Sequence, residues 1–148
     1  MIKLGTVDHH GEKLVVLFKE SLHDSSALPL ILETYSELLR NGFAQFSIPF
    51  KNNSKVVWLE NNNGVILGGI CFDYFQDRRE AWIYLSFTAP EFRGQGINEI
   101  CHTHFEKICK DYGAVSIGST VAVNNVSRLK SAKKVGLEPA YYKMFKSI

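Results

Sequence analysis

The sequence predicts a mixed α/β (α+β) fold contained in one domain, residues 1–148. Segments with the two-residue period of strands and segments with the 3.6-residue period of helices follow one another without a repeat or a linker. An Asn–Gly turn between two apolar segments indicates a hairpin of consecutive strands. A length of 148 residues matches one ordinary domain, which at this size buries roughly two-thirds of its extended-chain surface.

The first fifty residues predict one strand, two helices and a loop. Ile2–Val7 alternates apolar residues with small or polar ones, as a half-buried strand does. From Glu12 to about Leu22 the apolar residues can share a broad helical stripe, so a helix is expected. A second helix is expected over Leu28–Arg40, with Ser26 as its cap. Gly42–Ser54 is expected to be mostly loop.

The middle of the chain predicts three strands. Val56–Glu60 and Val65–Phe72 are joined through Asn61–Gly64, where the Asn–Gly pair supplies residues that tolerate a positive φ. Ala81–Thr88 is apolar or aromatic on both faces and is therefore expected to be a central strand.

The last fifty residues alternate helices and strands. The apolar residues of 97–112 recur at helical spacing, and Gly113 ends that segment. Val115–Val123 is expected to be a strand with small residues on one face, 125–135 a helix, and 141–146 a last strand.

Composition excludes several classes of protein. The net charge is +2, from 17 basic and 15 acidic residues, which is too balanced for a protein whose main partner is a nucleic acid. The sequence has no signal peptide and no apolar stretch long enough to cross a membrane, so a cytoplasmic protein is expected.

Cysteine and histidine residues do not indicate a metal site. Cys101, His102 and His104 are one to three positions apart on a predicted helix, and neighbours one or two apart point in different directions. Cys71, Cys101 and Cys109 are expected to be buried thiols in a reducing compartment.

The segment from Thr88 to Asn98 is the most informative part of the sequence, because it joins a central strand to the start of a long helix. A helix N-terminus exposes N–H groups without intrahelical partners, and the glycines at 94 and 96 allow an anion to approach the main chain. A phosphate or pyrophosphate is the expected ligand. The P-loop pattern and the dinucleotide-binding pattern are both absent.

Arg93-x-x-Gly96-x-Asn98, preceded by Pro90-Glu91-Phe92, resembles the [QR]-x-x-G-x-[GA] motif of the GNAT superfamily of acyl-CoA-dependent N-acyltransferases. The resemblance covers about the last 70 residues, since 82–88 resembles the family's fourth strand and 121–137 its fifth strand, fourth helix and following turn. It implies a GNAT-like fold, in which helices flank a central, mostly antiparallel sheet.

The resemblance also implies a binding site for acetyl-CoA as co-substrate. Main-chain N–H groups would hold the pyrophosphate at Gly94, Gln95, Gly96, Ile97, Asn98 and Glu99, and pantetheine would meet Ser86, Phe87, Thr88 and Asn125. Arg93 either adds charge to this site or is a solvated arginine that only orders the turn. Asn98 stands where the family usually has Gly or Ala.

Catalytic residues are less clearly indicated. The resemblance implies an oxyanion-binding main-chain N–H within Tyr84–Ser86 and a general base at Glu80, for which the alternative is a solvated glutamate at the strand end. Ala132 stands where many members of the family carry the tyrosine that acts as general acid. Tyr141 is the expected substitute, with Tyr142, Ser127, Ser131 or water as alternatives.

The resemblance thus implies an N-acetyltransferase that transfers acetyl by direct attack, in a ternary complex, to an amine on a small molecule or a protein. A non-catalytic acyl-CoA-binding sensor or assembly module is the alternative. The family sets the acceptor through the segment that is here about 23–51, where aromatic residues could line a pocket or pack in the core: Tyr35, Phe43, Phe46 and Phe50. Homodimers are common in the family.

Overall fold

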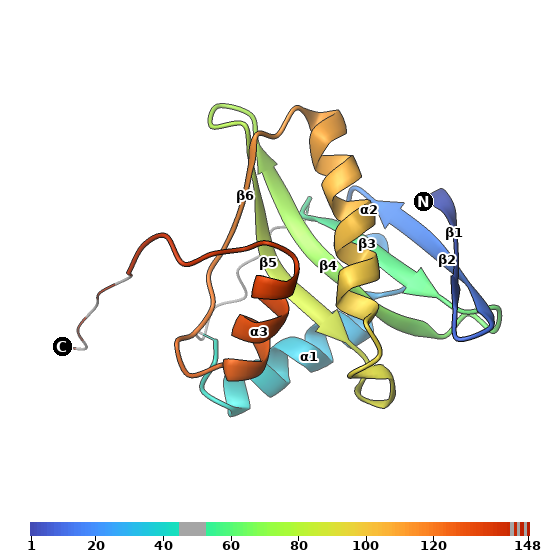
Figure 1. The fold of residues 1–148 in the computed structure, drawn as a ribbon, viewed down its shortest axis with the longest axis horizontal. Helices are drawn as coiled ribbons and strands as arrows, with labels where there is room; N and C mark the ends of the chain where they lie inside the picture. The colour runs from blue at the N-terminus through green and yellow to red at the C-terminus, as the bar shows by residue number, and fades with distance from the viewer. Residues whose placement is uncertain (45–52, 143, 145, 147) are drawn as a thin grey trace.

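The computed structural model describes residues 1–44, 53–142, 144, 146 and 148, and Figure 1 shows the fold. The strands are β1 (Ile2–His9), β2 (Glu12–Lys19), β3 (Lys55–Glu60), β4 (Ile66–Phe75), β5 (Glu80–Thr88) and β6 (Ser116–Ser119). The helices are α1 (Leu28–Arg40), α2 (Ile97–Tyr112) and α3 (Val126–Lys134), with short 3-10 turns η1 (Leu22–Asp24) and η2 (Pro90–Phe92). The sheet order is β1-β2-β3-β4-β5-β6, and only the β5–β6 pair is parallel. The predicted mixed α/β class with a mostly antiparallel sheet is confirmed.

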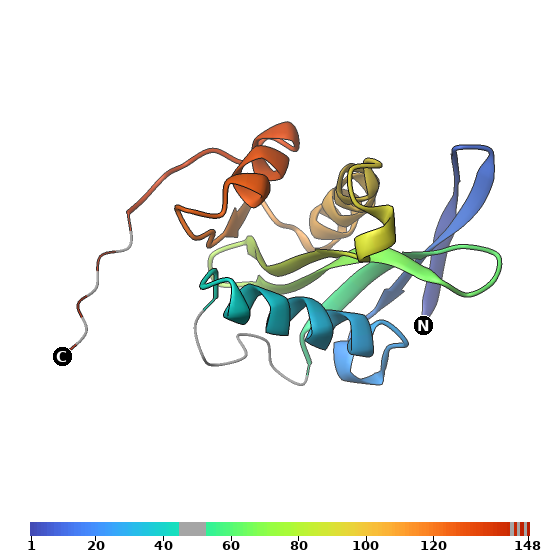
Figure 2. The same cartoon turned by 90° about the horizontal axis from the view of Figure 1, so that it is seen from below.

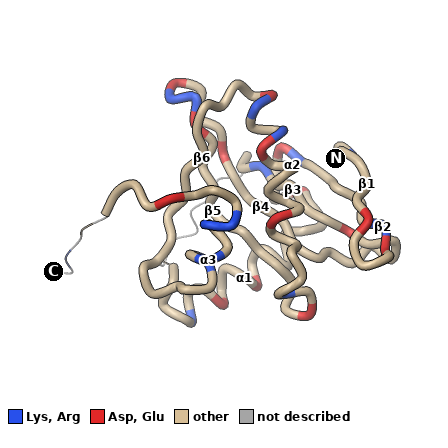
Figure 3. Tube along the Cα trace, viewed as in Figure 1, with Lys and Arg blue, Asp and Glu red and all other residues tan. Residues whose placement is uncertain are grey.

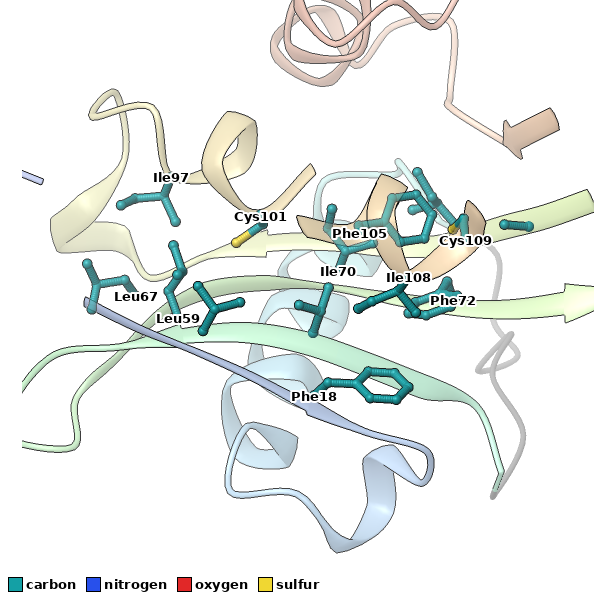
Figure 4. Packing of buried hydrophobic residues seen from close by; sticks show 14 of the residues in the cluster. Phe18, Leu59, Leu67, Ile70, Phe72, Ile97, Cys101, Phe105, Ile108 and Cys109 are labelled. Carbon is teal, nitrogen blue, oxygen red and sulfur yellow. The ribbon is translucent and has the colours of Figure 1, made fainter. Parts of the chain in front are cut away.

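Two apolar layers cover the sheet. Figure 2 shows α2 and α3 on one face of the sheet and α1 on the other. The first layer packs α2 onto β2, β3 and β4, and Figure 4 shows its helix side chains above those of the strands. Phe105 of α2 lies in its centre, fully buried, with its ring 4.8 Å from that of Phe72. The second layer packs α1 and η1 onto the opposite face, around Trp58 and Ile31.

The helix predicted from Glu12 to Leu22 is wrong, because Glu12–Lys19 forms strand β2. β2 pairs with β1 and β3 and is buried on both faces, with Leu14 and Val16 in one layer and Leu17 in the other. A strand buried on both faces has a continuous apolar run, which periodicity alone does not distinguish from a buried helix. The sharp turn before β2, where His10 and Gly11 both have positive φ, is the hairpin signal that the sequence reading missed.

Three smaller predictions also need correction. The N-cap of α1 is Ala27 and not Ser26, whose hydroxyl donates instead to the Glu60 carboxylate at 3.2 Å. The strand expected over Val115–Val123 is limited to Ser116–Ser119. The last strand, expected over 141–146, is absent from the described residues of that segment. These residues pair with none of the six strands of the sheet. The Asn–Gly hairpin and the long helix α2 are confirmed.

An irregularity in β5 changes which way its side chains point. Ile83 pairs with Phe72 and Leu85 with Cys71, so Tyr84 has no partner on β4 and forms a β-bulge. Before the bulge, Ala81 and Ile83 point to the α2 layer. After it, Leu85 and Phe87 point to the α1 layer. Glu80 and Trp82 therefore lie on the α1 side of the sheet, and Ser86 lies on the α2 side.

The predicted burial of the three cysteines is confirmed, and none of the thiols is a candidate nucleophile. Cys71, Cys101 and Cys109 are free and buried, and burial raises the pKa of the Cys101 and Cys109 thiols to about 12. Figure 3 shows acidic and basic residues interspersed over the described chain, with basic residues gathered on α3. Within the ranges described above, no helix has the length and apolar character needed to span a membrane.

Candidate active site

The turn between β5 and α2 presents its main chain to an anion. Gly94 and Gly96 have φ values of 77° and 78°, in the left-handed region that favours glycine, and Gly96 is the N-cap of α2. The first hydrogen bond of the helix runs from the Ile100 N–H to the Gly96 carbonyl at 3.2 Å. The N–H groups of Ile97, Asn98 and Glu99 therefore lie in a first turn that has no intrahelical acceptors, where the helix dipole is positive.

Two contacts fix this turn from outside the helix. The Nε2–H of His9, at the end of β1, donates to the Gln95 carbonyl at 2.7 Å, so the first hairpin holds the turn. The Gln95 side chain donates back to the Glu91 carbonyl at 3.4 Å. A Cβ at Gly94 or Gly96 would meet nothing within 4 Å, so the backbone angle, and not crowding within the chain, requires glycine there.

The second half of β5 leaves one edge open beside this turn. β6 pairs with β5 only as far as Ile83 and Ser119, where the Ser119 hydroxyl donates to the Ile83 carbonyl at 3.2 Å. The main chain of 84–88 consequently has no partner on β6. The end of β5 adjoins the start of α2, since a Cβ at Gly68 would lie 2.5 Å from the Phe87 carbonyl oxygen and 2.9 Å from Ile97 Cγ2.

Arg93 holds the turn through its side chain and is already paired. Its two terminal nitrogens donate to the Glu37 carboxylate at 3.0 and 2.9 Å, and its Nε donates to the Thr88 carbonyl at 3.2 Å. The hydrogen bond to Arg93 lowers the pKa of Glu37, and the same bond raises the pKa of Arg93. The guanidinium thus ties α1 to the end of β5.

Other predicted site residues offer the main chain or a cap. Phe87 and Ile97 are 2% exposed, so their side chains belong to the core and only their main chain is free to bind a ligand. Asn125 is the N-cap of α3, and its side-chain oxygen accepts from the Arg128 N–H at 3.2 Å. Glu99 meets Lys134 at 3.9 Å and so links α2 to α3.

Several buried polar atoms near this turn have no hydrogen-bond partner among the described residues. They are Ser86 Oγ on β5, both amide atoms of Asn98, His102 Nε2 on α2, and Arg128 Nη2 on α3. Ser86 lies on the α2 side of the sheet, and α2 and α3 contact each other on that side (Figure 2). Buried polar groups are normally satisfied, so atoms of this kind mark places where ordered water or a polar ligand binds.

Arg128 is the functional candidate that sequence reasoning missed. It meets no carboxylate within 4.0 Å among the described residues, and its guanidinium donates to the Ser131 hydroxyl at 3.2 Å. Burial lowers its pKa, and burial, with the nearby Arg128 charge, also lowers the pKa of His102 despite the opposing charge of Glu106. The signal in the sequence was an arginine on the same helical face as Asn125 and Ala132.

Glu80 lies on the opposite side of the sheet in an open hollow of about 440 Å³. The hollow is lined by Phe75, Arg78, Glu80, Trp82 and Tyr84. The Glu80 carboxylate is 3.5 Å from Arg78 Nη2. Burial first, and then the charge of Asp73 and a hydrogen bond to it, raise the pKa of Tyr84 to about 12, so its hydroxyl stays protonated at neutral pH.

The remaining predicted residues lie elsewhere. Tyr141 and Tyr142 are 96% and 91% exposed on the segment after α3, whereas Ala132 is buried on α3. Of the aromatic residues considered for the acceptor pocket, Tyr35 is buried in the α1 layer, and Phe46 and Phe50 lie outside the described residues. The turn, the open edge of β5 and α3 are thus brought together, and Tyr141 is not among them.

Comparison with known families gives one match. A model described as the acetyltransferase (GNAT) family matches residues 20–137 of the chain. A comparison with curated protein sequences finds no match.

Several solved structures share the fold at low sequence identity. The aminoglycoside acetyltransferase meta-AAC0020 from an uncultured soil metagenomic sample, in complex with trehalose, is 16% identical with a TM-score of 0.67, over 91% of this chain and 96% of that chain. A GNAT-family acetyltransferase from Listeria monocytogenes is 13% identical with a TM-score of 0.67, over 94% of each chain. The aminoglycoside N-acetyltransferase AAC(6')-Iy in complex with CoA is 14% identical with a TM-score of 0.64, over 100% of this chain and 99% of that chain. These likenesses show the fold.

Proposed function

The chain belongs to the acetyltransferase (GNAT) family, and we propose on that premise that it is an N-acetyltransferase, which transfers acetyl from acetyl-CoA to an amine by direct attack in a ternary complex. One observation carries the proposal. The unpaired N–H groups of the first turn of α2 adjoin the open edge of β5, so a single ligand can bind both with a phosphate group and with an extended polar arm.

The residues present fit coenzyme A. Its pyrophosphate would accept from the N–H groups of 94–99, and its pantetheine amides would pair with the main chain of 86–88. The Asn98 amide offers both a donor and an acceptor without a partner among the described residues, which an amide of the pantetheine arm or a bridging water would satisfy. A relative of the same fold is described in complex with CoA, which supports the assignment.

Bound acetyl-CoA supplies the activated acetyl thioester, and the chain supplies the surroundings for attack. A main-chain N–H within 84–86 would bind the oxyanion, and the end of the β5–β6 pairing at Ile83, which leaves that strand edge open, supports this role. One such donor is typically worth about 3 to 4 kcal/mol. Loss of the oxyanion donor would therefore slow the transfer by about 10²- to 10³-fold.

The acid and base stay predictions. Four residues of strand, about 13 Å, separate Glu80 from Tyr84, so a proton would reach Glu80 through water. A role for Tyr141 as general acid requires its exposed segment to approach β5. The coenzyme A thiolate can also leave without a general acid, because the pKa of a thiol is only about 8.5.

The experiment that tests the proposal is an acceptor screen with the purified chain. We expect free CoA to appear, together with an acetylated product by mass spectrometry, when acetyl-CoA is mixed with at least one primary amine of a panel of diamines, aminoglycosides and lysine peptides. Tight CoA binding without product on any acceptor would favour the non-catalytic alternative.

Replacing Arg128 should weaken CoA binding without lowering the stability of the free protein. Arg128→Met removes a buried charge that has no carboxylate partner in the described chain, so we expect the free protein to unfold at an unchanged or higher temperature. Because a hydrogen bond to a charged group is worth about 1.5 to 3 kcal/mol, the affinity for CoA should fall at least about tenfold.

Calorimetric titration with CoA and a thermal melt of the free protein measure the two effects of Arg128→Met. Lys107→Gln, an exposed lysine on the outer face of α2, is the control and should change neither. An Arg128→Met protein that binds CoA as tightly as the unmodified chain would show that this charge does not serve the ligand.

A further inference from the structure

The hollow around Glu80 lies on the side of the sheet opposite to the proposed coenzyme site. Ala81 and Ile83 point to the α2 layer, so Glu80 and Trp82 point the other way, and Tyr84 packs against the α1 layer. The volume of the hollow, about 440 Å³, is within the range of small-molecule sites. The coenzyme and a ligand in the hollow would thus approach the Tyr84 main chain from the two faces of the sheet.

A cation of the chain itself already lies at one end of the hollow. Arg78, from the turn between β4 and β5, has its guanidinium carbon 4.4 Å from the centre of the Phe75 ring and one nitrogen 3.5 Å from the Glu80 carboxylate. This is the arrangement that binds a cation by an aromatic face and a carboxylate together. Glu80 is 27% exposed and Arg78 56%, so the contact is at the surface and weak enough to be exchanged.

The other end of the hollow is the place proposed for acetyl transfer. Glu80 and Tyr84 are four residues apart on an extended strand, about 13 Å. Trp82 lies between them and presents an aromatic wall, held where its ring covers Gly118 of β6. Tyr84 is fixed by its hydrogen bond to Asp73, which in turn accepts from the Ser54 hydroxyl at 3.1 Å. Along the hollow, a cation-binding end at Glu80 is therefore followed by the apolar wall of Trp82 and then by the open strand edge at Tyr84.

We propose that this hollow is the acceptor site and that it selects amines with a second cation, which replaces Arg78 between Phe75 and Glu80. The proposal rests on the acetyltransferase function proposed above. The acceptor amine would lie at Tyr84 and the second cation up to about 13 Å away along the strand, a range that extended diamines with about eight to ten methylene groups reach. Arg78 is then a tethered competitor of the acceptor, and Glu80 is its anchor.

The matched probes are 1,8-diaminooctane and 8-aminooctan-1-ol, which differ only in the second cation. Their binding to the chain is measured by calorimetry in the absence of acetyl-CoA. We expect the diamine to bind about threefold to tenfold more tightly, because its cation takes over the contacts with Phe75 and Glu80 while the released Arg78 guanidinium regains its hydration and side-chain freedom. This preference should weaken as the salt concentration rises.

Two variants separate the roles of the charges. Glu80→Gln should reduce the preference for the diamine to about onefold, whereas Arg78→Gln should tighten diamine binding severalfold because the competitor is gone. Lys107→Gln, which removes a positive charge from the opposite side of the sheet, is the control and should leave the preference unchanged. Thermal melts check that each variant is folded.

Equal binding of the two probes would overturn the proposal, and so would a diamine preference that persists in Glu80→Gln. Weaker diamine binding in Arg78→Gln would also overturn it, since Arg78 would then be part of the site and not its competitor. Because these readouts need no acetyl-CoA, diamine selection without acetyl transfer would contradict only the proposed function. Acetyl transfer to both probes with equal binding would contradict only the acceptor proposal.

Discussion

Gly96→Val is expected to reduce the affinity for CoA by at least about 100-fold. A β-branched residue at a φ of 78° is strained by roughly 1 to 2 kcal/mol, and relief of that strain rotates the N–H groups of the first turn of α2 away from the anion. Each charge-assisted hydrogen bond lost adds about 1.5 to 3 kcal/mol. Calorimetric titration with CoA, or with 3′-phosphorylated ADP, measures the loss.

Gly64→Val is the matched control for Gly96→Val. Gly64 has a φ of 74°, and a Cβ there would also meet nothing within 4 Å, but it lies in the turn between β3 and β4. The strain and the change in side chain are therefore similar, whereas the anion site is intact. Gly64→Val should lower the unfolding temperature and keep CoA affinity within about twofold. If both variants bind CoA as the unmodified chain does, the turn does not hold the pyrophosphate.

Phe105→Ala is expected to cause the largest loss of stability. Phe105 is fully buried between α2 and the sheet, above Phe72 in Figure 4. Its ring is 4.8 Å from that of Phe72 and 5.4 Å from that of His102. Truncation of a buried phenylalanine typically costs about 3 to 5 kcal/mol, from lost transfer energy and the cavity that remains. For a chain of this size the unfolding temperature should fall by about 10 °C.

Phe105→Leu provides the comparison for this variant, since it removes less volume and should cost clearly less. Below the unfolding temperature, Phe105→Ala should still bind CoA, because Phe105 packs under α2 and not at its first turn. A loss below about 1 kcal/mol in chemical denaturation of Phe105→Ala would contradict the central position of this ring in the core.

The sequence could predict the parts of the fold that depend on local signals. The Asn–Gly turn, the helical spacing of 97–112 and the glycines at 94 and 96 each have a local physical cause, and the structure has a hairpin, a helix and a left-handed turn there. The main-chain anion site at the start of α2 follows from the same signals, because it needs only a glycine turn and a helix N-terminus.

Features that depend on distant contacts could not be predicted in this way. Glu12–Lys19 is a strand because β1 and β3 pair with it, which its own apolar pattern does not reveal. Arg93 is tied to Glu37, 56 positions away, and Arg128 is half-buried on α3 with its charge near His102 of α2, so neither role is encoded in a local motif. The bulge at Tyr84 reverses the face of the β5 residues that follow it without a Gly or Pro signal, which is why Ser86 lies on the α2 side.

Calorimetric titration of the unmodified chain with CoA, followed by 3′-phosphorylated ADP, tests the central claim most directly. The phosphate site at the first turn of α2 predicts that both ligands bind, with CoA in the micromolar range and tighter than the nucleotide, since only CoA also reaches the open edge of β5. Absence of binding by both ligands would contradict the assignment of this turn as a coenzyme site.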